Sequence, residues 1–245
     1  MKKFGLIGFP LTHSFSKKYF TEKFADLGIS GSNQYDLFEL SDILKFPELL
    51  AQNADVVGIN VTIPHKVNVM QFLTDIDPAA KKIGAVNVIK VNPDKSLKGY
   101  NSDYYGFKRS VEEFIGPKEN MKALVLGNGG AAKAIMVALE DLGIEYKLVS
   151  RTKSETTITY DEANVLLPTH HLLVNTSPLG TYPNVDQCPD IDYEALTSEH
   201  FLHDLVYNPE VTMFMANGIK RGAKAKNGYE MLVHQAEKSW EIWNS

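Results

Sequence analysis

Short apolar runs rich in β-branched and aromatic residues alternate along the chain with segments whose apolar residues recur at helical spacing. In the first part of the chain the runs predict strands at 4–9, 33–40 and 54–63, and a hairpin with arms at 84–91 and 96–101. The turn sequence NPDK joins the two arms. Helical spacing predicts a helix over 16–27, which Gly28 ends, and a second helix over 67–73.

The same alternation continues to the end of the chain. Further strands are predicted at 122–127, 145–150, 170–177 and 201–207, and further helices at 106–114, 131–143 and 227–244. Strands that alternate with helices indicate βαβ units and a mostly parallel sheet, so the expected fold class is α/β. The motifs change in kind near residue 101, which predicts a domain boundary there. The last helix is polar and aromatic, and we expect it to return to the first domain.

A glycine-rich turn follows the strand at 122–127. The sequence GNGGAA fits the form G-x-G-x-x-G/A through Gly127, Gly129 and Ala132, with a strand before it and a helix after it. Such a turn lets the backbone approach a pyrophosphate, and the helix N-terminus supplies N–H donors to the anion. The alternative is a glycine turn that binds nothing. The strand–turn–helix context favours a dinucleotide site.

The end of the next strand bears on the choice of cofactor. An NAD site usually carries Asp or Glu there for the ribose 2′-hydroxyl, whereas this chain has Ser150, Arg151, Thr152 and Lys153. A guanidinium beside hydroxyls suits a 2′-phosphate. The alternative is a solvated basic turn.

Two polar residues are candidates for proton chemistry. Lys66 ends the sequence NVTIPHK, an apolar and β-prone stretch, where partial burial would bring the lysine pKa closer to the range useful for general acid–base catalysis. Asp103 stands at a strand-to-helix junction in NSDYYG. The alternatives are a surface lysine that opens the next helix and an aspartate that caps one. The segment HSFS, from His13 to Ser16, is either a rim of hydroxyls or another helix cap.

Composition excludes several classes of function. The net charge of −5 and the lack of a long Lys/Arg run argue against a nucleic-acid partner. No apolar stretch approaches the ~20 residues of a membrane span, and the N-terminus is interpreted as a strand rather than a signal peptide. The single cysteine, Cys188, excludes an internal disulfide framework and favours a reducing compartment, the cytoplasm. The histidines show no metal-ligand spacing, so no metal site is expected.

Taken together, the motifs resemble one family. The segments GFPLTHSFS, NVTIPHK, GAVN, GYNSDYYG, GNGGAAKA, SRT, NTSPLG, DLVYNP and NGYEMLVHQA occur in the order found in shikimate dehydrogenases. The resemblance covers essentially the whole chain. It implies an NADP-dependent enzyme that reversibly reduces 3-dehydroshikimate to shikimate in chorismate and aromatic amino-acid biosynthesis. It also implies an N-terminal α/β substrate domain at 1–101, completed by 226–245, and a Rossmann-like NADP-binding domain at 102–225.

The resemblance assigns a role to each matching residue. Lys66 and Asp103 would form the catalytic pair. The substrate would be held by Ser14, Ser16, Thr62, Asn87, Tyr207 and Gln235, with the first two on its carboxylate and Tyr207 near the same end. The cofactor would contact Gly127, Gly129, Gly130, Ala131, Ser150, Arg151, Thr152 and Gly228, the last near the nicotinamide.

The chain departs from the family pattern mainly around the cofactor. Lys17 stands where proline is usual, and SRT replaces NRT. Glu155 occupies the position of a frequent second arginine, which weakens the expected phosphate clamp. The segment between Thr152 and His170 is short, which predicts a trimmed helix on the adenine side.

Some alternatives remain open at this point. They are a quinate/shikimate dehydrogenase with relaxed substrate or cofactor choice, and a non-catalytic nucleotide-binding sensor. The intact Lys66 and Asp103 argue against the sensor. The expected partner is a small-molecule substrate, and the protein is expected to be a monomer or homodimer.

Overall fold

The computed structural model describes residues 1–11, 14–117 and 119–245, which form two compact units. Unit 1 contains Met1–Ser102 and Ala236–Ser245, and unit 2 contains Asp103–Gln235. The divisions expected from the sequence fall at 101/102 and 225/226. In the structure the second division falls inside helix α8 (Tyr229–Asn244), because this helix runs unbroken from unit 2 into unit 1.

Unit 1 is built on a mixed six-stranded sheet. Its strands lie in the order β2 (Asn33–Glu39), β1 (Lys2–Gly8), β3 (Val56–Val61), β5 (Val88–Val91), β6 (Leu97–Tyr100) and β4 (Asp75–Ile76). Strand β1 pairs in parallel with β2 and β3, whereas β5 is antiparallel to both β3 and β6. The predicted hairpin is therefore confirmed. It makes this sheet mixed, although the strand–helix alternation predicted mostly parallel pairing.

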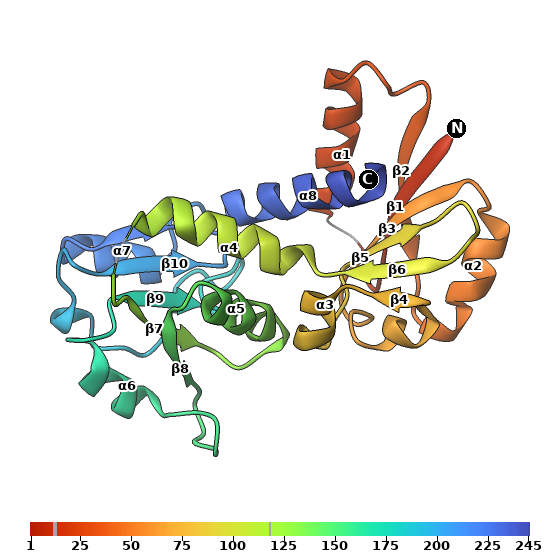
Figure 1. Ribbon diagram of the computed structural model, residues 1–245. Helices are drawn as coiled ribbons and strands as arrows, with labels where there is room; N and C mark the ends of the chain where they lie inside the picture. The colour runs from red at the N-terminus through yellow and green to blue at the C-terminus, as the bar shows by residue number, and fades with distance from the viewer. Residues whose placement is uncertain (12–13, 118) are drawn as a thin grey trace. The chain divides into compact units, whose positions relative to one another are not determined.

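Helices cover both faces of this sheet (Figure 1). One face carries α1 (Phe15–Asp26) and the second half of α8. The other face carries α2 (Phe46–Gln52), α3 (Pro78–Ile83) and two short 3₁₀ helices, η1 (Ile43–Lys45) and η2 (Asn68–Phe72). The helix predicted at 67–73 is thus a 3₁₀ helix rather than an α-helix. Its buried residue Val69 and its partly buried residues Met70 and Phe72 pack into the core.

An aromatic cluster joins the end of the chain to the first strand. Trp243 of α8 packs against Phe4 of β1, with ring centroids 5.0 Å apart, and against Phe20 of α1 at 5.2 Å. Its indole N–H donates to the carbonyl oxygen of Ile89 at 3.1 Å. Trp240, one turn earlier, lies 5.6 Å from Phe4. The prediction that the last helix returns to the first domain is confirmed.

Unit 2 contains a five-stranded parallel sheet. The strand order is β11 (Lys224–Lys226), β10 (Phe201–Asp204), β9 (Leu172–Asn175), β7 (Lys122–Leu126) and β8 (Glu145–Val149). The chain leaves β7 toward β8 and then returns to the other side of β7 with β9. Ligands of such doubly wound sheets bind outside the carboxyl ends of the strands at this reversal.

The helices of unit 2 flank this sheet (Figure 1). They are α4 (Ser102–Ile115, whose first residue belongs to unit 1), α5 (Gly130–Asp141), α6 (Tyr160–Leu166), α7 (Met213–Lys220), the first half of α8 and the 3₁₀ helix η3 (Tyr193–Ala195). The core combines strand residues such as Leu124 and Leu202 with Ala163 of α6 and Phe214 of α7. The α/β fold class is confirmed, and α7 is an element that the sequence pattern missed.

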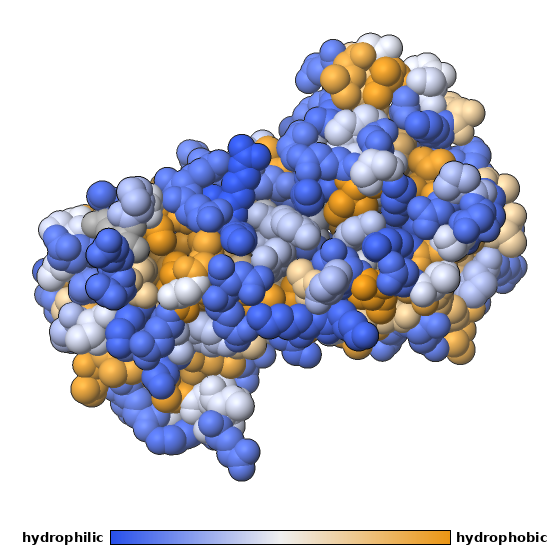
Figure 2. Space-filling model, in the orientation of Figure 1, coloured by the Kyte–Doolittle hydropathy of each residue, from blue (hydrophilic) through white to orange (hydrophobic). Residues whose placement is uncertain are grey.

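Hydrophilic residues dominate the face drawn in Figure 2, and its hydrophobic patches are separated from one another. Among the described residues, no helix combines the length and apolar character needed to cross a lipid bilayer.

We predict that Gly58→Ala destabilises the protein. A Cβ at Gly58 would lie 2.5 Å from the ring of Trp243, and this ring is held on its other sides by aromatic neighbours. Overpacking of this kind costs about 1–3 kcal/mol. Urea denaturation followed by tryptophan fluorescence measures the loss. Gly31→Ala is the matched control, because a Cβ at Gly31 would have no neighbour within 4 Å. Equal stability of the two variants would contradict the prediction.

Candidate active site

Three candidate residues of unit 1 come together at one edge of the sheet. Thr62 follows the end of β3, and its N–H donates to the carbonyl oxygen of Ile7 in β1 at 2.9 Å. Asn87 precedes the antiparallel strand β5, so it lies at the same edge, and its carbonyl oxygen accepts the N–H of Val61 at 2.8 Å. The carbonyl oxygen of Lys66 accepts the N–H of Val86 at 2.8 Å. The backbone therefore ties the Lys66 loop to the Asn87 loop.

Lys66 lies in the loop between β3 and η2, with a half-buried side chain. The preceding residue, His65, is buried, and its Nε2 forms a hydrogen bond with the carbonyl oxygen of Leu40. The loop is thus anchored on both sides of Lys66, to the segment after β2 through His65 and to the Asn87 loop through its own carbonyl group. This anchoring restricts where the ammonium group can lie.

The two serines of the HSFS segment lie at the start of α1. Ser14 is the N-cap, and its hydroxyl oxygen accepts the N–H of Lys17 at 3.2 Å. The capping interpretation is therefore correct for Ser14. The hydroxyl of Ser14 can still donate its proton to an acceptor such as a carboxylate. Ser16 is half-buried in the first turn of α1. His13 lies outside the described residues.

The unusual Lys17 has a structural partner. Its ammonium group donates to the carbonyl oxygen of Tyr35 and lies 3.4 Å from the Asp36 carboxylate. It therefore links the first turn of α1 to β2, at the position where the family pattern has proline.

A cluster of buried polar side chains lies beneath the same edge. Its members are Tyr35, Asn60, Asn87, Ser102 and Ser239, each at most 5% exposed. Burial raises the pKa of the Tyr35 phenol far above its usual range, which the neighbouring Ser16 side chain only partly offsets. Sequence reasoning found only Asn87 of this cluster. The other members stand in segments that looked like ordinary strand or helix.

Asp103 lies in the first turn of α4, one residue after Ser102. Because the helix begins at Ser102, the residue at the capping position is Asn101, and the interpretation of Asp103 as the helix cap is wrong. A carboxylate in the first turn of a helix is still favoured by the helix dipole. The neighbouring N–H of Ser102 donates to Oδ1 of Asn87 at 2.6 Å.

Three further candidates belong to unit 2. Tyr207 is exposed and follows β10. Gln235 is buried in α8, and its amide donates to the carbonyl oxygen of Leu232 at 3.0 Å. Gly228 precedes α8, and a Cβ there would lie 2.2 Å from the carbonyl oxygen of Leu205. Glycine is therefore required for the start of α8 to approach the segment after β10.

The glycine-rich turn connects β7 to α5. Gly127 has φ +115°, a conformation that other residues rarely adopt, and a Cβ there would lie 3.1 Å from the N–H nitrogen of Ser177. Gly129 is the N-cap of α5, and no side chain caps this helix. The first-turn residues Gly130 and Ala131 are exposed, so their N–H groups can bind an anion. The turn therefore fits the pyrophosphate of a dinucleotide.

A cavity of about 660 Å³ lies beside this turn, entirely within unit 2. It is lined by Gly127, Asn128, Gly129, Ser150, Arg151, Thr159, Tyr160, Asp161, Thr176, Ser177, Pro178, Leu179, Cys188 and Asp190. Most of these residues follow the carboxyl ends of β7, β8 and β9, which include the reversal between β7 and β9. The cavity is therefore where a doubly wound sheet binds its ligand.

The loop after β8 supplies the basic group of this cavity. Arg151 is exposed. Burial raises the pKa of Tyr160 in the same cavity; the charge of Arg151 partly offsets this rise, and Asp190 adds to it. The hydroxyl of Ser150 donates to the carbonyl oxygen of Thr152, which closes the loop on itself. Thr152 is exposed and is absent from the cavity lining. The following helix α6 has seven residues, which fits the expectation of a short adenine-side segment.

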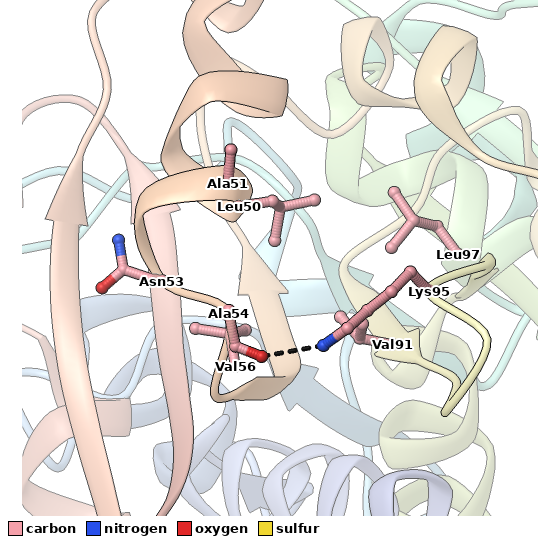
Figure 3. A pocket seen from close by; sticks show the side chains of 8 residues that line it. All are labelled: Leu50, Ala51, Asn53, Ala54, Val56, Val91, Lys95 and Leu97. Carbon is pink, nitrogen blue, oxygen red and sulfur yellow. Dashed lines mark hydrogen bonds between the residues drawn. The ribbon is translucent and has the colours of Figure 1, made fainter.

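Two other features lack the groups expected of a site. A cavity of about 260 Å³ in unit 1 has a mainly apolar lining, with the Lys95 ammonium donating to the carbonyl oxygen of Ala54 at 2.8 Å (Figure 3). It lies where β3 and β6 begin, at the edge opposite Thr62, and contains none of the candidate residues. Among the described residues, Glu113, Glu230 and His234 are close enough together to share a metal ion, but Glu230 pairs with Lys226.

Asp204 supports the loop that contributes Ser177 to the lining of the cavity beside the glycine turn. It is fully buried at the end of β10 and accepts hydrogen bonds from Thr212 at 2.6 Å and from the Asn175 amide at 2.9 Å. Asn175 in turn accepts the N–H of Ser177 at 3.0 Å. Burial raises the pKa of the Asp204 carboxyl from its ordinary 3.8 to about 6, against the opposing effect of these donors.

Comparison with known proteins identifies relatives over the whole chain. Residues 6–89 match the family model of the shikimate dehydrogenase substrate binding domain. A shikimate dehydrogenase (NADP(+)) of Clostridium beijerinckii is 42% identical over 99% of this chain and 92% of its own length.

Solved structures give the same result. The Thermus thermophilus enzyme, crystallised with NADP(H) and shikimate, is 27% identical over 99% of this chain and 93% of its own, with a TM-score of 0.85. The Listeria monocytogenes enzyme, crystallised with shikimate and NAD, is 26% identical over 100% and 92%, with a TM-score of 0.90.

We predict that Asp204→Asn changes how stability depends on pH. Because the folded state holds this proton more tightly than the unfolded chain, its contribution is fully present below the unfolded pKa of 3.8 and is lost as pH rises through about 6. The loss amounts to about 2–3 kcal/mol. The variant should therefore gain stability relative to wild type as pH rises from about 4 to about 7.

Urea denaturation across this pH range measures the difference. Asp186→Asn, which changes an exposed carboxylate of the same unit, is the matched control. A stability difference between Asp204→Asn and wild type that does not vary with pH would contradict the assignment.

Proposed function

The chain belongs to the shikimate dehydrogenase family, and from that premise we propose that it catalyses the NADP-dependent, reversible reduction of 3-dehydroshikimate to shikimate. One observation carries the proposal. Thr62, Lys66 and Asn87 converge at one sheet edge, within the segment that matches the substrate binding domain. The same chain carries the glycine turn and its cavity. An anion cradle alone would equally suit a nucleotide-binding sensor, whereas a lysine held beside polar substrate contacts suits proton transfer to an alcohol.

The substrate is assigned to unit 1. Ser14 and Ser16 bind its carboxylate, since each hydroxyl can donate to an anionic oxygen. Thr62 and Asn87 contact its ring hydroxyls. The cofactor is assigned to unit 2. The two assignments follow the predicted roles of the first domain in substrate binding and of the second domain in cofactor binding. The protein is a cytoplasmic monomer or homodimer with a small-molecule substrate; of these, the location rests on the single cysteine.

Lys66 and Asp103 carry the proton chemistry. A bound cofactor would supply the hydride as NADPH in the reductive direction and accept it as NADP⁺ in the oxidative direction. In the reductive direction, the alkoxide that develops on the substrate takes its proton from the Lys66 ammonium, which also stabilises the negative charge. In the oxidative direction, Lys66 takes the hydroxyl proton back. Asp103 bonds the same hydroxyl and orients the lysine.

The cofactor is held by the turn and by the loop after β8. The pyrophosphate lies against Gly127, Gly129, Gly130 and Ala131, at the uncapped N-terminus of α5. Arg151 pairs with the adenosine 2′-phosphate, with Ser150 and Thr152 beside it, and Gly228 lies near the nicotinamide. Asp190 and Asp161 line the same cavity as Arg151 and repel a phosphate, which moderates the preference for NADP over NAD.

Lys66→Ala is expected to lower kcat for shikimate oxidation by about 10²–10⁴-fold and to change the KM for shikimate little, because a proton-transfer group acts mainly in the transition state. Initial rates from NADPH absorbance measure both constants. Lys45→Ala, which removes an exposed lysine from the same unit, is the control. Near-normal turnover of Lys66→Ala would show that Lys66 is only a surface residue.

Arg151→Ala is expected to lower kcat/KM for NADP by about 10–100-fold and to leave kcat/KM for NAD nearly unchanged, because it removes one charge-assisted pair with the 2′-phosphate. Steady-state kinetics with both cofactors test this. Arg109→Ala, an exposed arginine of the same unit paired with Glu113, controls for loss of positive charge. An unchanged NADP/NAD ratio in Arg151→Ala would show that the loop is a solvated turn.

A further inference from the structure

The side-chain amide of Asn87 is held at both of its polar atoms by one residue. Its Oδ1 accepts the backbone N–H of Ser102 at 2.6 Å, and its Nδ2 donates to Oγ of Ser102 at 3.1 Å. Because a backbone N–H can only donate, this pair fixes which end of the amide is oxygen. Because the amide group is planar, these two hydrogen bonds also fix the direction of the second N–H bond of Nδ2.

The hydroxyl of Ser102 is itself oriented by α8. Ser102 and Ser239 share a hydrogen bond between their hydroxyl oxygens at 3.3 Å. Oγ of Ser239 accepts the side-chain amide of Asn60 at 3.0 Å. Both serines are fully buried, so neither hydroxyl can exchange this arrangement for hydrogen bonds to water.

Asn60 has its own orientation set from the other side. Its Oδ1 accepts the phenolic O–H of Tyr35 at 2.8 Å, which turns Nδ2 toward Ser239 and toward the carbonyl oxygen of Asn87 at 3.4 Å. A continuous chain of hydrogen bonds therefore runs beneath the candidate site, from Tyr35 in β2 to Asn87.

The fold does not need this chain in order to hold α8. Trp243 and Trp240 already bury the last turns of the helix against aromatic residues. Buried polar networks contribute little net stability compared with apolar packing, but when every member has a partner they select a single geometry. The hydrogen bonds of Asn60 and Ser239 thus set side-chain orientation rather than add stability.

We propose that Asn60 and Ser239 are positioning residues, which set the orientation of the Asn87 amide for contact with a hydroxyl of the substrate. The inference rests on the proposed function for the identity of that substrate, shikimate. It gives the returning helix α8 a role in substrate affinity through a residue that touches no substrate. Ser239 acts through Ser102, and Asn60 acts through Ser239.

The test is Ser239→Ala, which removes one oxygen atom and places a good helix former in a helix. We expect the KM for shikimate to rise about tenfold, kcat to stay within about threefold, and the KM for NADP to stay unchanged; tenfold corresponds to about 1.4 kcal/mol. A purely structural defect would instead lower the fraction of active enzyme, and so apparent kcat, at constant KM. Ser239→Thr, which restores the hydroxyl, should recover at least part of the affinity.

Ser110→Ala is the matched control. Ser110 is also a fully buried helical serine, and its hydroxyl shares a hydrogen bond with His203 at 3.0 Å in unit 2. This variant makes the same chemical change outside the chain of hydrogen bonds, so its KM for shikimate should equal that of wild type.

A readout without substrate separates this inference from the proposed function. The NMR signals of the Asn87 side-chain amide in the ligand-free protein should shift or broaden in Ser239→Ala and remain unchanged in Ser110→Ala. Wild-type protein that fails to oxidise shikimate would overturn the proposed function, and the NMR result would still decide the positioning. Unchanged Asn87 signals, or equal KM values for the two alanine variants of an active enzyme, would overturn the inference.

Discussion

The packing of Trp243 against Gly58 is the contact on which the arrangement of unit 1 depends. The absence of a side chain at Gly58 lets the indole lie directly on strand β3, where its N–H reaches the carbonyl oxygen of Ile89. Aromatic rings from β1 and α1 enclose the indole on its other sides. A segment more than 150 residues away in sequence thereby completes the core of the first unit. Large aromatic side chains bury enough apolar surface to offset the entropy of closing so long a loop.

This return of α8 has a chemical consequence. The turn that carries Trp240 and Trp243 against the sheet also brings Ser239 to Asn60 and Ser102. Apolar packing supplies the free energy that fixes the helix, and the polar contacts then act on a helix that is already placed. This separation explains how fully buried amides and hydroxyls can define the geometry of a site without being its main source of stability.

Unit 2 follows a different constraint, the direction of its parallel strands. All five strands present their carboxyl ends at one edge, so the loops after β7, β8 and β9 meet there. Gly127 accepts the positive φ that brings its backbone beside Ser177, and Asp204 anchors the Ser177 loop through Asn175. The uncapped start of α5 then leaves N–H donors at the rim of the cavity. The proposed anion site is a result of this topology and of one glycine.

The sequence by itself determined the α/β class, the hairpin, the glycine turn and the return of the last helix, because these depend on local periodicity and on residue types with few conformational options. It also identified the family, through motifs spread over the whole chain. The roles of Lys66, Asp103 and the other candidates remain predictions. The sequence did not predict the 3₁₀ geometry of η2 or the helices α2, α3 and α7, because short segments take their form from the core on which they pack.

Only the tertiary structure revealed the partners of the buried polar residues. Tyr35 reads as a strand residue and Ser239 as a position on an amphipathic helix, and neither carries a local signal for a site. Asn60 and Ser239 stand 179 positions apart, and their hydrogen bond exists only after β3 and α8 have met. A polar atom can be buried when it has a hydrogen-bond partner, and the sequence alone does not show which residue that partner is.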